Sequence, residues 1–189
     1  QRQMCIRDRM RTVGDIVRQY KKAIKEFPDY HGRIYVNIDD TGLGGGVTDR
    51  LREVKREDKL NRLYVVPINA AEKIETDTKA GKDAAEHYNN LTTHMWAVLK
   101  DLMENQEIEI EEDSETFAQL SSRKYFLASN GKLELESKKE MKKRGLDSPD
   151  RGDAAALSVY LGKIKKYTGS APNQANTAGL GKSSYWKNR

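Results

Sequence analysis

Residues 148–157 read SPDRGDAAAL, a stretch typical of the start of a helix. Ser148 is a good N-cap residue and Pro149 suits the first helical position, so the pattern predicts that a helix begins here. Asp150 and Asp153 are three residues apart, which places both carboxylates on one face of its first turns. Anions are favoured at that end of a helix, so capping alone explains Asp150. Asp153 lies too far into the predicted helix to cap it.

A second acidic element lies at residues 34–46, which read IYVNIDDTGLGGG. Its β-branched run predicts a strand over residues 33–38, followed by Asp39, Asp40 and a glycine-rich turn. A carboxylate at a strand end that faces one at a helix start can hold a divalent cation, and such cations cleave phosphodiesters. Because neighbouring strand residues point to opposite faces, Asp39 and Asp40 cannot have equal roles. The alternative is that both aspartates only open the turn, a position that Asp favours.

With two further segments, these stretches resemble the nuclease domain of the large subunit of tailed-phage terminases. The resemblance runs from about Val13 to Tyr167. In the family's order and spacing, the four segments are VNIDDTGLGGGVTDRL, HYNNLTTHMWAVLKDLMEN, QLSSRKYFLASNGKLELESKKEMKKRGL and SPDRGDAAAL. The resemblance implies an α/β, ribonuclease H-like fold, with a mixed sheet flanked by helices. It also implies an endonuclease that cuts concatemeric viral DNA during genome packaging.

The resemblance further implies the roles of the acids. The family pattern Asp-x-x-Gly-x-Gly places a catalytic, metal-binding acid on Asp39, and the family's last catalytic acid falls on Asp153. Asp40 is then a neighbour of the metal site, and Asp150 an auxiliary ligand. Two Mg²⁺ or Mn²⁺ ions held by such carboxylates activate water and stabilise the leaving oxygen.

The family's first acid lies on a strand upstream of the helix that we expect over residues 12–27, and no such strand is evident. The expected domain is therefore N-terminally truncated and lacks its first strand or strands, which leaves the activity of this fragment open. Residues 1–10 resemble a translated sequencing adapter, and the alternative is that they form a disordered segment. Residues 11–167 are expected to form the partial nuclease domain. Residues 168–189 are rich in Gly, Ser, Asn and Ala and predict a disordered tail.

Composition agrees with a nucleic-acid partner without requiring one. The 189 residues carry a formal net charge of +5, a mild basic excess. No apolar run is long enough to span a membrane, and no secretory signal is evident. Cys5 is the only cysteine, which excludes a disulfide framework and a cysteine zinc site. The resemblance implies a protein that acts in the cytoplasm of an infected bacterial host, with double-stranded DNA, a terminase small subunit and a portal protein as its partners. It also implies a parent protein that is an ATPase as well.

A basic cluster lies just before the SPDRGDAAAL stretch. It consists of Lys138, Lys139, Lys142, Lys143 and Arg144. Such side chains can hold the DNA backbone by contacts that do not depend on sequence. The alternative is a solvated basic face, which is usual for charge runs of this kind.

Hydrophobic periodicity and turn residues predict the remaining elements. Helices are expected over residues 12–27, 47–55, 84–105, 113–120 and 149–166, and strands over residues 33–38, 63–67, 108–110, 124–128 and 132–136. The Asn130-Gly131 pair predicts a hairpin between the last two strands. Two other functions remain open: a different ribonuclease H-like nuclease such as a junction resolvase, or a DNA-binding assembly module that uses the basic cluster without metal.

Overall fold

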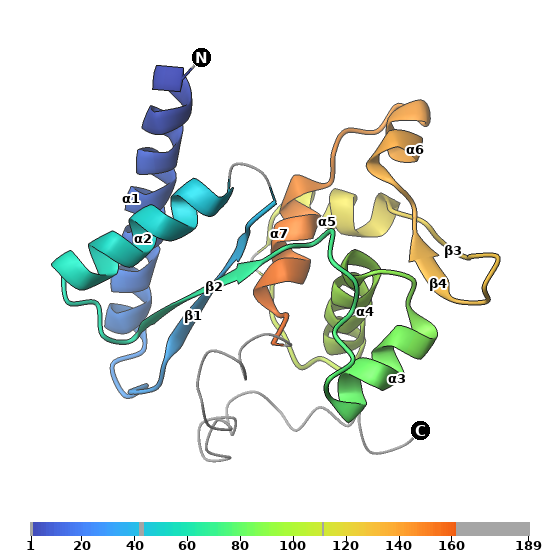
Figure 1. Ribbon diagram of the computed structural model, residues 1–189, viewed down its shortest axis with the longest axis horizontal. Coiled ribbons are helices and arrows are strands. Elements are labelled where there is room, and N and C mark those ends of the chain that lie inside the picture. The colour runs from blue at the N-terminus through green and yellow to red at the C-terminus, as the bar shows by residue number, and fades with distance from the viewer. Residues whose placement is uncertain (1, 42–43, 111, 162–189) are drawn as a thin grey trace. The chain divides into compact units, whose positions relative to one another are not determined.

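The computed structural model describes residues 2–41, 44–110 and 112–161. The chain divides into two compact units, residues 1–69 and 70–189. Both units combine helices with a small sheet, so the expected α/β class is confirmed (Figure 1). In the part of the chain that the structure describes, every helix is too short or too polar to cross a membrane.

The first unit is a β-α-β arrangement preceded by a long helix (Figure 1). Its elements are α1 (Arg2–Glu26), β1 (Ile34–Asp39), α2 (Gly44–Glu57) and β2 (Leu63–Ile68). The two strands pair in parallel, from Ile34 opposite Leu63 to Asp39 opposite Ile68. Parallel neighbours need a crossover connection, and α2 provides it. The expected strands at residues 33–38 and 63–67 are confirmed to within one residue.

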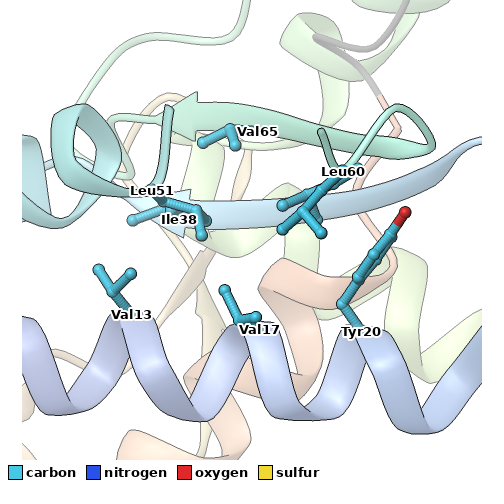
Figure 2. Packing of buried hydrophobic residues seen from close by; sticks show 8 residues of the cluster. Val13, Val17, Tyr20, Ile38, Leu51, Leu60 and Val65 are labelled. Atoms are coloured by element: carbon cyan, nitrogen blue, oxygen red, sulfur yellow. The ribbon is translucent and has the colours of Figure 1, made fainter. Parts of the chain in front are cut away.

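The core of this unit lies between α1, α2 and one face of the strand pair. Figure 2 shows Val13 and Val17 of α1 pointing toward Ile38 and Leu51, which come from β1 and α2. Leu51 is fully buried, and full burial of such a side chain is worth about 1.5–3 kcal/mol. The spacing of four between Val13 and Val17 is the helical period that predicted this buried face.

Helix α1 begins at Arg2, about ten residues before the expected start. Of the two expectations for residues 1–10, a disordered segment is wrong for residues 2–10, which are helical, whereas an adapter origin stays a prediction. These residues contain neither Gly nor Pro, and they include three arginines and two methionines. Such residues have good helix propensity, so a helix fixed by the packing of residues 13–20 extends through them.

The second unit contains five helices and a two-stranded sheet among its described residues. Its elements are α3 (Lys79–His87), α4 (Leu91–Glu104), α5 (Ser114–Ser122), β3 (Tyr125–Leu127), β4 (Leu133–Leu135), α6 (Lys138–Lys143) and α7 (Asp150–Ser158). Helix α4 is the most buried of them, and it contacts both α7 and β4. The parallel and antiparallel strand pairs form two separate sheets, one in each unit, rather than one mixed sheet.

The single helix expected over residues 84–105 is two helices. Asn90 interrupts it, because its side chain accepts a hydrogen bond from the Thr93 amide at 2.8 Å and so caps α4. Tyr88 and Asn89 instead run beside β4, where the Asn89 amide donates to the Leu133 carbonyl at 2.8 Å. Local capping and strand pairing thus outweigh the continuous apolar stripe of the sequence.

The expected hairpin is confirmed, with β3 and β4 antiparallel around residues 128–132. Gly131 has φ of 76°, a conformation that glycine adopts without steric cost. The expected strand at residues 108–110 is wrong, because those residues have no regular structure. An isolated extended segment needs a pairing partner, and none of the described strands pairs with it.

The start of α7 differs from the expectation by one residue. The helix begins at Asp150, and Pro149 rather than Ser148 takes the cap position, without a side-chain hydrogen bond. The Ser148 hydroxyl donates instead to the Asp150 carboxylate at 2.6 Å. The helix ends at Ser158 with Val159 as its C-cap, so the expected helix is wrong for residues 159–161, where the Tyr160 amide closes a turn on the Leu157 carbonyl at 3.2 Å. The expected continuation over residues 162–166 and the expected tail at 168–189 lie outside the described residues.

Candidate metal and DNA site

The two aspartates at the end of β1 differ in their surroundings. Asp39 is exposed, and its Oδ1 accepts a hydrogen bond from the Thr41 amide at 3.0 Å. Asp40 is half-buried, and its Oδ1 accepts from the Thr48 hydroxyl of α2 at 3.0 Å. Strand alternation accounts for the difference. Asp39 is therefore the one whose carboxylate remains accessible to a ligand, whereas Asp40 holds the start of α2 to the strand end.

Asp153 lies in the first turns of α7 and is the centre of a polar cluster. Its Oδ1 accepts hydrogen bonds from Trp96 Nε1 at 2.9 Å and from Arg123 Nη1 at 2.7 Å. Its Oδ2 forms an ion pair with Lys138 Nζ at 2.8 Å. The side chain is 26% exposed, so one side of the carboxylate faces solvent. Three donors, from α4, from the C-cap of α5 and from α6, therefore fix a carboxylate that stays accessible.

Arg123 is the most rigidly held of these donors. Its side chain is only 5% exposed, and its guanidinium lies over the Trp96 ring, 4.8 Å from the ring centroid. Its Nε donates to the Glu136 carbonyl at 3.1 Å. A planar guanidinium held by stacking and by hydrogen bonds loses little further entropy on binding a carboxylate. Arg123 therefore orients Asp153 rather than reaching toward solvent.

Lys138 lies between two carboxylates at the N-terminus of α7. Its Nζ is 3.1 Å from Asp150 Oδ1 and 2.8 Å from Asp153 Oδ2. Partial burial alone would lower the pKa of Lys138, but the hydrogen bonds to Asp153 and Asp150 outweigh it and raise that pKa. Hydrogen bonds from Ser148 and then from Lys138 hold the pKa of Asp150 below its ordinary value. This pair of carboxylates thus binds a positive charge, supplied here by an ammonium group.

The remaining basic residues of the 138–144 cluster fall into two groups. Arg144 donates to both oxygens of Glu136, at 2.7 and 2.6 Å, and its Nη2 also donates to the Ser122 carbonyl at 2.8 Å. Hydrogen bonding from Arg144 holds the pKa of Glu136 below its ordinary value. The alternation of Glu136 with Leu133 and Leu135 along the chain predicts that Glu136 lies on the exposed face of the hairpin. This prediction is wrong, because its carboxylate is buried under Arg144.

Lys139, Lys142 and Lys143 are exposed on α6. Within the described part of the chain, none of the three forms an ion pair. They remain candidates for phosphate contacts, whereas Lys138 and Arg144 are engaged in internal ion pairs. A Ser137–Glu140 capping box starts this helix; its S-x-x-E pattern is visible in the sequence and is a known helix-start signal.

The acids match the chemistry of a hard divalent ion only in part. Over the described residues, neither unit brings three His, Cys, Asp or Glu side chains together as a metal-binding group. Asp150 and Asp153 supply oxygen ligands of the kind that Mg²⁺ and Mn²⁺ prefer, and they already share one cation. The described residues of the second unit therefore fit part of a metal shell, and its completion needs ligands from elsewhere.

Sequence reasoning missed the two residues that hold Asp153. Trp96 lies on the apolar stripe of α4, whose helical spacing predicts a core residue, and its ring is buried. A buried indole N–H needs an acceptor, which is a weak signal that a polar partner lies nearby. Arg123 has no sequence signal, because its contact with Asp153 spans 30 residues.

No protein-family model and no curated protein matches this sequence. Solved structures do match it. The nuclease domain of the large terminase subunit gp2 of bacterial virus Sf6 is 18% identical, with a TM-score of 0.54, over 75% of this chain and 69% of that chain.

Two structures of a point mutant of that domain, one with manganese and one with calcium, are 18% identical with a TM-score of 0.54. This chain spans about two thirds, 65%, of the length of the manganese structure. The likeness shows that this chain has the ribonuclease H-like fold of a terminase nuclease domain, as the sequence motifs indicated.

Proposed function

We propose that this chain is the metal-dependent endonuclease domain of a phage terminase large subunit, and that it cuts concatemeric viral DNA during genome packaging. The observation that supports this most is the Asp153 cluster, a partly exposed carboxylate that Trp96 and Arg123 hold in place and that already binds a cation, the Lys138 ammonium. It lies on the fold of a domain that has been solved with manganese and with calcium. The host cytoplasm, a terminase small subunit and a portal protein belong to the same proposal.

In this proposal the four acids have different roles. Asp39 and Asp153 are the catalytic carboxylates, Asp150 is an auxiliary metal ligand, and Asp40 supports the end of β1. Mg²⁺ or Mn²⁺, when bound as a pair, would supply an activated water and stabilise the leaving oxygen. The protein's own contribution is to hold the Asp153 carboxylate in one orientation through Arg123.

Lys138 pairs with the two carboxylates that would hold the metal in this proposal. Its ammonium lies 3.1 Å from Asp150 and 2.8 Å from Asp153, so these carboxylates would hold a divalent ion only if the Lys138 side chain moved away from them. The displaced side chain is long enough to turn toward a DNA phosphate, where its positive charge would again be paired. Exchange of a lysine for a metal avoids leaving either carboxylate unpaired, which would be costly in this partly buried cluster.

DNA binding is assigned to the free face of α6. Lys139, Lys142 and Lys143 are exposed and can contact phosphates without breaking an internal ion pair. Replacement of all three by alanine should weaken duplex binding and reduce the slope of log K against log salt by about 0.9 for each lost phosphate contact. Replacement of the exposed Lys21 and Lys25 of α1 is the control. An unchanged slope in the α6 variant would mean that the cluster is only a solvated face.

The metal proposal can be tested without measuring activity. Mn²⁺ is paramagnetic, and an ion bound to Asp153 lies close to the Trp96 indole N–H that donates to the same carboxylate. In ¹H–¹⁵N spectra of Trp186→Phe protein, substoichiometric Mn²⁺ should broaden the Trp96 indole signal, whereas Ca²⁺ should not. Asp153→Asn should abolish the broadening, and the exposed Asp147→Asn should not. Equal broadening in the Asp153→Asn protein would exclude this metal site and leave a DNA-binding module.

A further inference from the structure

The first turn of α7 needs hydrogen-bond acceptors from outside the helix, because the first N–H groups of any helix have no partner within it. One of them is satisfied nearby, because the Asp150 amide donates to the Ser148 carbonyl at 2.9 Å. The first bond of the helix itself runs from the Asp153 amide to the Pro149 carbonyl, at 2.8 Å. Pro149, at the cap position, has no side-chain acceptor. The two amides between these positions must therefore find an acceptor on another element.

Gln119 of α5 supplies that acceptor. Its Oε1 accepts hydrogen bonds from the Arg151 amide at 2.8 Å and from the Gly152 amide at 3.1 Å. Its Nε2 faces Glu115 Oε1 at 3.3 Å. The amide orientation follows from these partners, because the carboxylate can only accept and the backbone amides can only donate. One side chain of α5 thus caps the N-terminus of a different helix.

Ion pairs hold α5 and α7 together beside this cap. Arg151 of α7 contacts Asp113 at 2.8 Å and Glu115 at 2.8 Å, at the start of α5. Hydrogen bonds from Thr116 and then from Arg151 hold the pKa of Asp113 below its ordinary value. These pairs are exposed and contribute little energy each. Between the start of α5 and α7, the Gln119 hydrogen bonds therefore fix the first turn of α7 more firmly than these ion pairs do.

The same turn of α7 is in close contact with Trp96. A Cβ atom placed on Gly152 would lie 2.7 Å from Trp96 Cη2, so the α7 backbone rests directly against the indole ring. The Nε1 of that indole donates to Asp153, the next residue of α7. A shift of the α7 backbone at Gly152 therefore alters the geometry of the Trp96–Asp153 hydrogen bond.

We infer that Gln119 is a positioning residue for Asp153: its amide oxygen fixes the first turn of α7 and thereby the orientation of the Asp153 carboxylate. The catalytic consequence rests on the proposed function, whereas the positioning itself does not. Gln119 would contact neither DNA nor metal, and it acts through the backbone of Arg151 and Gly152.

The test compares three variants. Gln119→Leu removes the acceptor. The exchange Glu115→Gln with Gln119→Glu keeps an acceptor oxygen at position 119 and a hydrogen-bond partner at 115. Gln19→Leu makes the same chemical change on an exposed face of α1 and is the control. Each variant is measured in Trp186→Phe protein by the Trp96 indole ¹H–¹⁵N signal without metal, and by the rate of plasmid nicking in Mn²⁺, at a temperature where circular dichroism shows it folded.

Gln119→Leu should move the indole signal toward its position in an Asp153→Ala reference protein. It should also lower the nicking rate about 10²-fold, the effect of displacing a catalytic group by about 1 Å. The exchange variant should restore both properties, and Gln19→Leu should change neither. If Gln119→Leu does not fold, Gln119→Asn takes its place, because its shorter side chain withdraws the acceptor.

A folded Gln119→Leu protein with the wild-type indole signal would overturn the inference, whatever its melting temperature. If the protein does not nick DNA even with the family's upstream strand and acid restored, the proposed function fails, and the indole signal still decides whether Gln119 positions Asp153.

Discussion

His94 should make the second unit sensitive to mild acid. The imidazole is buried on α4, stacked on Tyr88 with ring centroids 5.3 Å apart and edge-on to Tyr160 at 6.0 Å. Neither ring nitrogen has a hydrogen-bond partner among the described residues. Burial lowers the pKa of His94 from 6.5 to about 4. The folded state therefore holds this imidazole neutral at a pH where the unfolded chain binds a proton.

The sign and size of the effect follow from linkage. Between pH 6.5 and about 4 the unfolded state binds more protons, so stability falls as the pH falls. At about 1.4 kcal/mol for each pH unit, the whole window corresponds to about 3 kcal/mol, of which about 2 kcal/mol is lost by pH 5. Asp113, Asp150 and Glu136 have pKa values below their ordinary values of 3.8 for Asp and 4.5 for Glu. The stability that they contribute is therefore lost only near and below those values, outside the range from pH 7 to 5.

Urea unfolding of Trp186→Phe protein, followed by Trp96 fluorescence, measures this unit at pH 7 and pH 5. His94→Phe keeps an aromatic ring against Tyr88 and removes the titration. The wild-type protein should lose about 2 kcal/mol between the two pH values and the variant much less. Tyr160 does not interfere, since burial and nearby carboxylates raise its pKa to about 12. The same loss in the His94→Phe protein would refute the argument.

Two further changes test the packing around the site. Gly152→Ala should lower the free energy of unfolding by about 1–3 kcal/mol in urea titrations, because the added Cβ would lie 2.7 Å from Trp96. A Gly-to-Ala change normally stabilises a helix, so greater stability of the variant would show that Trp96 can move away. Arg144→Ala should lower the melting temperature more than the matched change Lys143→Ala, because it leaves the carboxylate of Glu136 buried without its partner; equal melting temperatures would mean that Arg144 is only a surface cation.

The sequence predicted the elements that local signals determine. The hairpin followed from Asn130-Gly131, and the start of α5 from Asp113, which caps it through the Thr116 amide at 2.9 Å. The unlike environments of Asp39 and Asp40 followed from strand alternation. In each case the deciding interaction lies within a few residues along the chain, where propensity and capping rules apply.

The rest depends on contacts between distant segments. The break at Asn90 reflects the pairing of residues 88–89 with β4, more than 40 residues later. The partners of Asp153 come from α4, from the start of the hairpin and from α6, and no periodicity indicates that they meet. Arg144 and Lys138 read as free cations in the sequence, and only the fold shows that each is paired with a carboxylate.

Plasmid nicking in Mn²⁺ tests the central claim most directly. The account predicts that the domain nicks DNA once the family's upstream strand with its acid is restored, and that EDTA stops the reaction. In that protein Asp39→Asn and Asp153→Asn should each abolish cutting while duplex affinity is retained. Asp40→Asn should be milder, because its carboxylate is bonded to Thr48, and Asp150→Asn should fall between. Cutting at the wild-type rate by the Asp153→Asn protein would contradict the account.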